Sequence, residues 1–231
     1  MDKVEISKLF SYSFSVDSVI FGFKDGQIHV LLIKRSVEPF INSWAIPGDL
    51  VYPTEDLSIA AKRILTELTS ISNIDLHQAQ TFGEPNRHPQ GRVITTAYFA
   101  LIRIENFKIE ASSWAEAVKW VPIHEVKELA FDHNLILKST FDVLKQKLAS
   151  EPVCFDLLPP KFTLNQMQQL FEYANSLEMD KANFRKKIKA IPLLKLDEKQ
   201  KNVKHRPAKL FSFDSEKYEE LVKNNEFVFK M

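Results

Sequence analysis

The 231 residues carry 31 Lys and Arg against 30 Asp and Glu, and 45% of them are apolar. This composition is ordinary for a globular protein, and no apolar run approaches the roughly 18 to 20 residues of a membrane helix. The single cysteine, Cys154, excludes an internal disulfide and a multi-cysteine zinc site, and its apolar neighbours favour burial over catalysis. The first residues lack the apolar core of a signal peptide, so we expect a cytoplasmic protein.

Strands are predicted along the first two thirds of the chain, where short apolar runs alternate with turn residues. The predicted strands cover residues 14–23, 29–35, 77–83, 92–104 and 118–121. Asp25 and Gly26 between the first two strands are typical of a two-residue hairpin turn.

Helices are predicted where apolar residues recur at three- and four-residue spacing. The predicted helices cover residues 55–69, 123–129, 133–149, 164–171, 180–190 and 215–223. Asp56 or Thr54, Thr163 and Asp180 could cap three of them at the amino end.

Prolines divide the chain after the helix predicted over residues 133–149. Pro152 and the pair Pro159 and Pro160 flank a segment that predicts a stiff, extended connector. Beyond it, two helices followed by a basic hairpin have the outline of a winged helix-turn-helix. We therefore expect a domain over residues 1–150, a linker over 151–160 and a second domain over 161–231.

Positive charge is concentrated in the second domain. Residues 181–209 hold 11 basic and 2 acidic side chains, a net charge of +9 that is a candidate footprint for a polyanion. Phe184, Ile188 and Ile191 share one helix stripe facing the core, which leaves the other faces for the major groove of DNA. The predicted DNA-binding residues are Lys181, Ala182, Asn183, Arg185, Lys186 and Lys189 on the helix and Lys201, Lys204, His205 and Arg206 on the wing. The alternative is a solvated basic face.

Residues 84–92 form a turn-rich loop with several hydrogen-bonding side chains beside a predicted strand end. Arginine offers a planar fork that suits phosphates or sugar hydroxyls. The predicted effector-binding residues are Trp44, Asp49, Arg87, His88 and Arg92. A solvated turn with Arg92 in a salt bridge is the alternative.

Residues 47–71 resemble the Nudix box, G-x5-E-x7-R-E-U-x-E-E-x-G-U, where U is a bulky aliphatic. Glu55, Arg63, Leu65 and Glu67 match this pattern, whereas four positions differ: Asp49 and Ser70 replace glycines, and Ile64 and Leu68 replace glutamates. Mg²⁺ needs hard oxygen ligands, which the family supplies from one helix face. Because positions 64, 67 and 68 read Ile, Glu and Leu, we expect no metal, no cofactor and no catalytic residue. Glu67 is then a surface residue or a partner of Arg63, and Ile64 and Leu68 make an apolar pocket floor.

Both halves together resemble the Nudix-related transcription regulators. The resemblance is carried by VDSVIFGF, the altered box, FGEPNRHPQGRVITTAYFALI, FDLLPPKFTLNQMQQLFE and MDKANFRKKI. It extends to regulators of NAD metabolism and especially to arabinose-responsive regulators of Bacteroides-type bacteria. It implies an α/β (α+β) chain: a Nudix-like mixed-sheet α/β/α sandwich followed by a winged helix. It also implies a homodimer on a palindromic operator, which an effector releases.

The expected function is transcriptional repression with a small-molecule effector. An apolar pocket floor without metal favours a neutral sugar, such as a pentose, over an ADP-ribose-like nucleotide. Two alternatives remain: a Mg²⁺-dependent Nudix hydrolase of a nucleoside diphosphate derivative, and a sugar- or nucleotide-binding module with no DNA partner.

Overall fold

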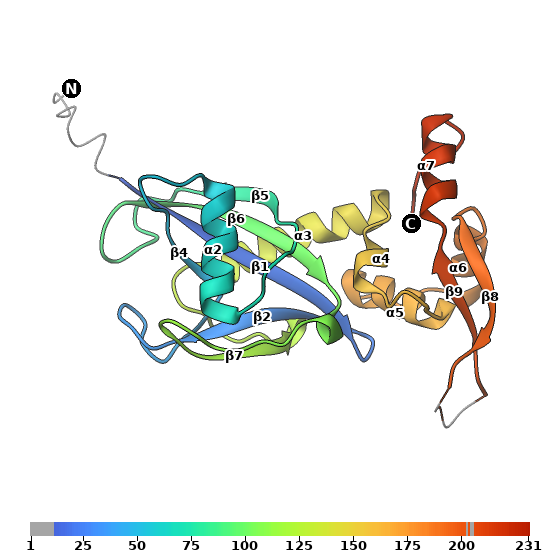
Figure 1. The fold of residues 1–231 in the computed structure, drawn as a ribbon, viewed down its shortest axis with the longest axis horizontal. Helices are drawn as coiled ribbons and strands as arrows, with labels where there is room; N and C mark the ends of the chain where they lie inside the picture. Colours follow the sequence, from blue (N-terminus) through green and yellow to red (C-terminus); the bar gives the residue numbers. More distant parts are fainter. Residues whose placement is uncertain (1–11, 202, 204–205) are drawn as a thin grey trace. The chain divides into compact units, whose positions relative to one another are not determined.

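The computed structural model describes residues 12–201, 203 and 206–231 (Figure 1). Its internal contacts divide it into two compact units. Of the described residues, the first unit holds 12–21 and His29–Asp142, and the second holds Gly22–Ile28 and those between Val143 and Met231. Within the described residues, every helix is too short or too polar to cross a membrane.

A seven-stranded sheet forms the centre of the first unit. Its strands are β1 (Ser13–Lys24), β2 (Gln27–Arg35), β3 (Trp44–Ala45), β4 (Gly48–Leu50), β5 (His77–Phe82), β6 (Val93–Ile102) and β7 (Ala115–Pro122). The order is β3-β2-β1-β6-β5, with β4 paired to β1 and β7 paired to β2. The predicted hairpin turn is confirmed, because Asp25 and Gly26 have φ values of 51° and 79°, the left-handed pair that a type I′ turn requires.

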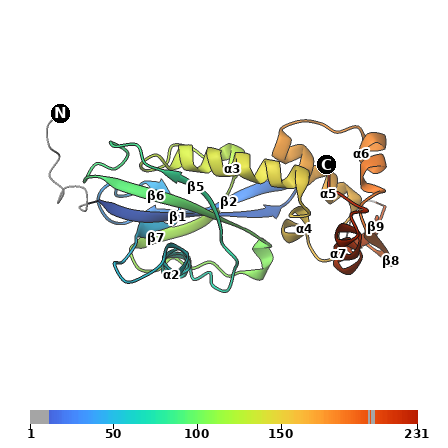
Figure 2. The same cartoon turned by 90° about the horizontal axis from the view of Figure 1, so that it is seen from above.

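Two helices cover opposite faces of this sheet, α2 (Leu57–Thr69) and α3 (His133–Ser150) (Figure 2). Asp56 caps α2 by accepting from the Ser58 N–H. Ser70 ends α2 with φ 61°, the left-handed conformation that explains the glycine at this place in the Nudix box. The mixed α/β sandwich is therefore confirmed.

The helix expected over residues 123–129 is wrong in extent. Only a single 3₁₀ turn, η2 (Ile123–Glu125), forms there; a second one, η1 (Ile104–Asn106), follows β6. The Asn134 side chain accepts from the Leu129 N–H at 2.8 Å and donates to the Lys127 carbonyl at 3.0 Å. These bonds hold the backbone in a non-helical conformation.

The second unit is a winged helix. Its elements are α4 (Cys154–Leu157), α5 (Leu164–Asn175), α6 (Lys181–Ile188), β8 (Leu193–Lys199), β9 (Lys209–Phe213) and α7 (Ser215–Lys223). Thr163 and Gln166 form a capping box at α5, and Asp180 caps α6 by accepting from the Asn183 N–H. Both predicted caps are confirmed.

The extended connector expected around residues 151–160 is wrong. Residues 154–157 form α4, and Cys154 and Leu157 are buried in the second unit. The Phe155 ring stacks on Phe213 with centroids 4.0 Å apart. The apolar side chains of this segment therefore complete a core, which an extended linker would leave in water. Burial raises the pKa of the Cys154 thiol, in line with its expected inert role.

Candidate functional site

Asp17 lies at the centre of a buried polar cluster, although it sits in the apolar strand β1. Its side chain is 5% exposed. The Thr95 hydroxyl donates to Asp17 Oδ2 at 2.6 Å, and His133 Nε2 lies 3.4 Å from Asp17 Oδ1. Gly48 makes room for the carboxylate, because a Cβ at Gly48 would lie 2.0 Å from Asp17 Oδ1.

His133, the first residue of α3, is held as a neutral ring. The Ile46 N–H donates to His133 Nδ1 at 3.0 Å, so the ring proton is on Nε2, which faces Asp17. Burial lowers the pKa of His133 despite the nearby carboxylates of Asp17 and Asp132. The cluster therefore gains no positive charge from this histidine at neutral pH.

Arg87 enters the cluster from the loop before β6 and is also buried. Its guanidinium makes a two-bond pair with Asp132, from Nε at 2.8 Å and from NH2 at 2.6 Å. The same NH2 lies 3.9 Å from Asp17 Oδ2, and the Arg87 side chain is 4% exposed. Two carboxylates therefore compete for one cation.

Aromatic rings form the next layer of the cluster. The Phe131 ring stacks on His88 with centroids 5.0 Å apart. The Arg35 guanidinium lies 4.9 Å from the Trp114 ring and 5.0 Å from the Phe131 ring. Trp114 Nε1 donates to Asp49 Oδ2 at 2.9 Å. Planar cations and rings in this arrangement suit a ligand that carries both flat and anionic groups.

Of these groups, Asp17, Phe131 and His133 line a cavity of about 70 Å³. Of the predicted effector-binding residues, Asp49, Arg87 and His88 line it together. Because drug-sized ligands occupy pockets of roughly 300 to 1,000 Å³, the site must open to admit a molecule of that size.

Trp44 and Arg92 lie outside this cavity. Trp44 packs under Lys119, whose Nζ is 3.8 Å from the ring centroid, and lines a separate cavity of about 350 Å³. Arg92 donates to the Gly83 carbonyl at 2.7 Å, and its guanidinium lies 5.8 Å from the Tyr12 ring centroid. Conversely, sequence reasoning missed Asp17, Asp132 and His133. The one available signal was Asp17, a lone acid within the apolar run FSVDSVIFGF.

The acids that match the Nudix box are held by Arg63. Its Nε and NH2 donate to the two Glu55 oxygens at 2.9 and 2.5 Å, and NH1 donates to Glu67 at 3.1 Å. The guanidinium also lies 3.9 Å from the Tyr52 ring centroid. The expected pairing of Glu67 with Arg63 is therefore confirmed, and the bonds to Glu55 raise the pKa of Arg63.

Ile64 and Leu68 are core residues, each 1% exposed and packed in a cluster with Val16, Ile33 and Tyr98. They do not form a pocket floor as expected, because their helix face turns into the sheet. In the described part of the chain, no group of three or more His, Cys, Asp or Glu side chains could hold a metal ion. Ile64 and Leu68 offer no oxygen atom at their box positions, whereas the carboxylates of Glu55 and Glu67 are paired with Arg63.

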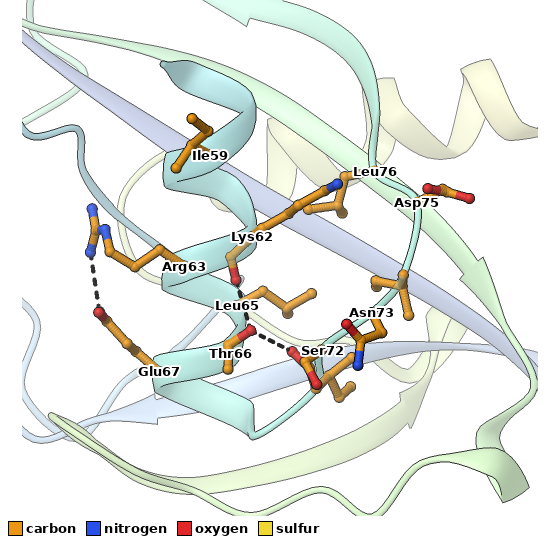
Figure 3. A pocket seen from close by; sticks show the side chains of 12 residues that line it. Ile59, Lys62, Arg63, Leu65, Thr66, Glu67, Ser72, Asn73, Asp75 and Leu76 are labelled. Atoms are coloured by element: carbon orange, nitrogen blue, oxygen red, sulfur yellow. Dashed lines mark hydrogen bonds and ion pairs between the residues drawn. The ribbon is translucent and has the colours of Figure 1, made fainter. Parts of the chain in front are cut away.

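A larger groove of about 700 Å³ runs between α2 and residues 71–76 (Figure 3). Lys62, Leu65 and Glu67 line it from α2, and Asn73, Asp75 and Leu76 line it from the following segment. The Thr66 hydroxyl on α2 lies 2.9 Å from the Ile71 carbonyl oxygen of the other wall and 2.9 Å from the Lys62 carbonyl oxygen of its own helix, and it donates to one of them at a time. The groove has the size of a ligand site, but among the described residues that line it Lys62 and Arg63 are the only cations.

The candidate DNA interface lies on α6 and the β8–β9 hairpin. Phe184, Ile188 and Ile191 are at most 5% exposed, as predicted. The predicted DNA-binding residues Lys181, Ala182, Asn183, Arg185, Lys186, Lys189, Lys201 and Arg206 are all exposed. Lys204 and His205 lie outside the described residues.

Lysines also face each other across the wing. Lys199 and Lys209 are directly paired between β8 and β9. Neighbouring Lys195 and Lys199 lower the pKa of Lys209. Like charges directly opposite each other destabilise a hairpin, so this arrangement favours a polyanionic partner.

Comparison with known proteins identifies both units. The NUDIX domain model matches residues 12–140, and the NrtR DNA-binding winged helix domain model matches residues 154–213. The chain is 32% identical, over 209 residues, to the "ADPR responsive transcriptional repressor NtrR" of Acinetobacter baylyi; the match covers 89% of this chain and 83% of that protein.

Two crystal structures of Shewanella oneidensis NrtR resemble the chain, each at 28% identity. The complex with a 27mer DNA has a TM-score of 0.70 and covers 87% of this chain and 93% of that one. The NUDIX domain in complex with ADP ribose has a TM-score of 0.56 and covers 62% of this chain and 94% of that one.

Proposed function

The chain belongs to the NUDIX family and within it to the NrtR-type transcriptional regulators, and we propose that it is a repressor that ADP-ribose, or a nucleotide like it, releases from operator DNA. The observation that carries this proposal is the match to the Acinetobacter baylyi repressor, which extends through both units. Binding of DNA through α6 and the wing is supported by their exposed cations and by the DNA complex of the Shewanella oneidensis relative.

The expected preference for a sugar is not supported. It relied on Ile64 and Leu68 as an apolar pocket floor, and both side chains are in the core. The Acinetobacter baylyi relative is named as an ADPR responsive repressor, and the NUDIX domain of the Shewanella oneidensis relative was crystallised with ADP ribose. A buried arginine fork beside aromatic rings offers hydrogen bonds to phosphate and stacking to a base, which suits a nucleotide better than a pentose.

We place the effector at the polar cluster, with Asp49, Arg87 and His88 among its contacts. The alternative place is the groove beside α2. Arg87→Gln should abolish ADP-ribose binding measured by calorimetry, whereas Lys62→Ala, which changes the groove, should retain it. The reverse result would move the effector site to the groove.

DNA release is tested with a fluorescent fragment of the chain's own upstream DNA. The protein should bind it at low salt, and ADP-ribose should weaken binding about 5- to 150-fold, the usual range of allosteric coupling. Arabinose should have no effect. Absence of DNA binding, or DNA binding that ADP-ribose leaves unchanged, would contradict the proposal.

The second candidate is hydrolysis of ADP-ribose, which the NUDIX family match favours. We propose that the chain is a regulator without this activity, because the acids Glu55 and Glu67 are held by Arg63. Incubation with ADP-ribose and Mg²⁺ should give no AMP. Turnover that Glu67→Gln abolishes would establish an enzyme instead. A homodimer and a cytoplasmic location remain predictions.

A further inference from the structure

Arg87, a buried cation in the cavity wall, is already paired with an internal carboxylate through Nε and NH2. Asp132 accepts two hydrogen bonds from it, at 2.8 and 2.6 Å. Such a two-bond fork has the geometry with which arginine binds a phosphate group. An anionic ligand must therefore compete with Asp132 for Arg87.

The charge around the cavity also opposes an anion. The charged groups in and beside it are Asp17, Asp49, Asp132, Arg35 and Arg87. Burial lowers the pKa values of the two histidines in the wall, so they add no charge at neutral pH. Three carboxylates then face two guanidinium groups, and a diphosphate is admitted only if one carboxylate withdraws.

Asp132 is the carboxylate placed to withdraw. Its side chain is 18% exposed, whereas that of Asp17 is 5% exposed. Phe131 before it has φ 54°, a left-handed conformation that is unusual for a bulky residue. Its ring is held there by Phe40 at 4.7 Å and His88 at 5.0 Å. The backbone next to Asp132 is therefore kept in an uncommon conformation by side-chain packing.

Asp132 directly precedes α3, the helix that continues into the second unit. The Asp132 carbonyl accepts the N–H groups of Leu135 and Ile136 at 2.9 and 3.1 Å. From there α3 runs without a break to Ser150, and its residues from Val143 onward belong to the second unit. A displacement at the start of α3 is therefore passed along a continuous helix.

We propose that Arg87 and Asp132 form a latch that the diphosphate of the effector opens. The phosphate oxygens accept the Arg87 N–H groups in place of the Asp132 carboxylate, and the freed start of α3 shifts the chain away from its DNA-binding conformation. This inference rests on the proposed function and names the contact through which the effector acts.

The decisive variant is Asp132→Asn in the full chain. It removes the competing charge, so ADP-ribose measured by calorimetry should bind about tenfold tighter, within the usual range of allosteric coupling. The affinity for the upstream DNA without ADP-ribose should fall by a similar factor, because the latched state is the one that binds DNA. A purely structural role of Asp132 would instead weaken ADP-ribose binding.

Two further variants control for the loss of any carboxylate near α3 and for a change in how α3 begins. Asp142→Asn makes the same chemical change within α3, at a partly exposed carboxylate that pairs with Lys138 at 3.1 Å, and should alter neither affinity. Asp132→Ser removes the charge but keeps a residue favoured before a helix, so it should behave like Asp132→Asn if α3 still starts normally. Thermal unfolding checks that each variant folds.

The latch is overturned if the wild type responds to ADP-ribose while both Asp132 variants bind it equally or more weakly. If the wild type binds DNA but ignores ADP-ribose, the proposed effector is wrong rather than the latch. Inorganic diphosphate then replaces ADP-ribose in the titrations. Tighter binding to Asp132→Asn than to Asp142→Asn supports the latch, and equal binding overturns it.

Discussion

At the scale of single residues, the space around Asp17 depends on Gly48. A Cβ added there would lie 2.0 Å from Asp17 Oδ1 and 2.9 Å from the Val16 carbonyl oxygen. Gly48→Ala should therefore lower the free energy of unfolding by about 1 to 3 kcal/mol, the usual cost of overpacking. Urea denaturation followed by tryptophan fluorescence measures this change.

Gly83→Ala is the matched control for that prediction. The nearest group to its added Cβ would be the Arg92 NH2 at 3.8 Å, which is ordinary contact. Equal stability of the two alanine variants would show that Asp17 does not require the close approach of Gly48.

His133 predicts a specific pH dependence of stability. Burial lowers the pKa of His133 below the ordinary value of 6.5. On acidification the unfolded chain therefore binds a proton at His133 at pH values where the native chain does not. Stability is therefore complete above about pH 6.5 and falls below it, by at most about 1.4 kcal/mol per pH unit for one group. Urea titrations between pH 7.5 and 5.5 measure the slope.

His133→Gln should remove this part of the pH dependence. A glutamine amide can accept from the Ile46 N–H and donate to Asp17, so it keeps both contacts without titrating. If the variant and the wild type lose stability at the same rate on acidification, His133 is not the group responsible.

At the scale of elements, local sequence patterns predicted the long elements well. The helices α2, α3, α5 and α6 follow apolar spacing, and predicted caps support α2, α5 and α6. The strands β1 and β2 follow from apolar runs on either side of a turn. Such signals are local, and here they agree with the tertiary fold.

Three features could not be predicted because they depend on distant partners. The strands β3 and β4 have two and three residues and exist through pairing with β2 and β1. The segment of α4 is helical because this conformation packs Phe155 in a core, where its ring centroid lies 5.7 Å from that of Phe162. In the buried polar cluster around Asp17, Arg87 was predicted as a binding residue because of its guanidinium group. Asp132 was not predicted, because its role follows from pairing with Arg87, 45 residues away in the sequence.

The exposed face of α6 predicts how DNA binding responds to salt. Arg185→Ala and Lys186→Ala should each weaken operator binding, and a cation that contacts phosphate should also reduce the slope of log affinity against log salt by about 0.9. Fluorescence anisotropy at 50 to 200 mM salt measures both quantities. Lys217→Ala on α7, where Lys217 pairs with Glu220 at 2.8 Å, is the control and should change neither.

At the scale of the whole molecule, positive and negative charge are divided between the two parts of the chain. Residues 159–231 carry 15 basic and 10 acidic side chains, whereas residues 1–158 carry 16 and 20. The basic part holds most of the match to the DNA-binding winged helix domain model, and the acidic part holds the match to the NUDIX domain model. A net positive charge attracts the DNA phosphates and a net negative charge is repelled by them, so the charge division agrees with the two domain matches.

The last prediction concerns the assembly. A winged helix with one recognition helix as short as α6 reads few base pairs, so specific repression favours two copies on a two-fold symmetric operator. Light scattering should give a mass about twice the 26.7 kDa of one chain. Two recognition helices then require half-sites about one helical turn, or a multiple of it, apart.

Insertion of five base pairs between the half-sites tests this geometry, because it rotates one half-site by about half a turn to the opposite side of the DNA. Affinity should fall to that of a fragment with one half-site, since the second helix can no longer reach its groove. A monomer, or two independently binding chains, would keep the original affinity for each half-site after the insertion. That outcome would contradict the homodimer and would leave the release of DNA to each chain separately.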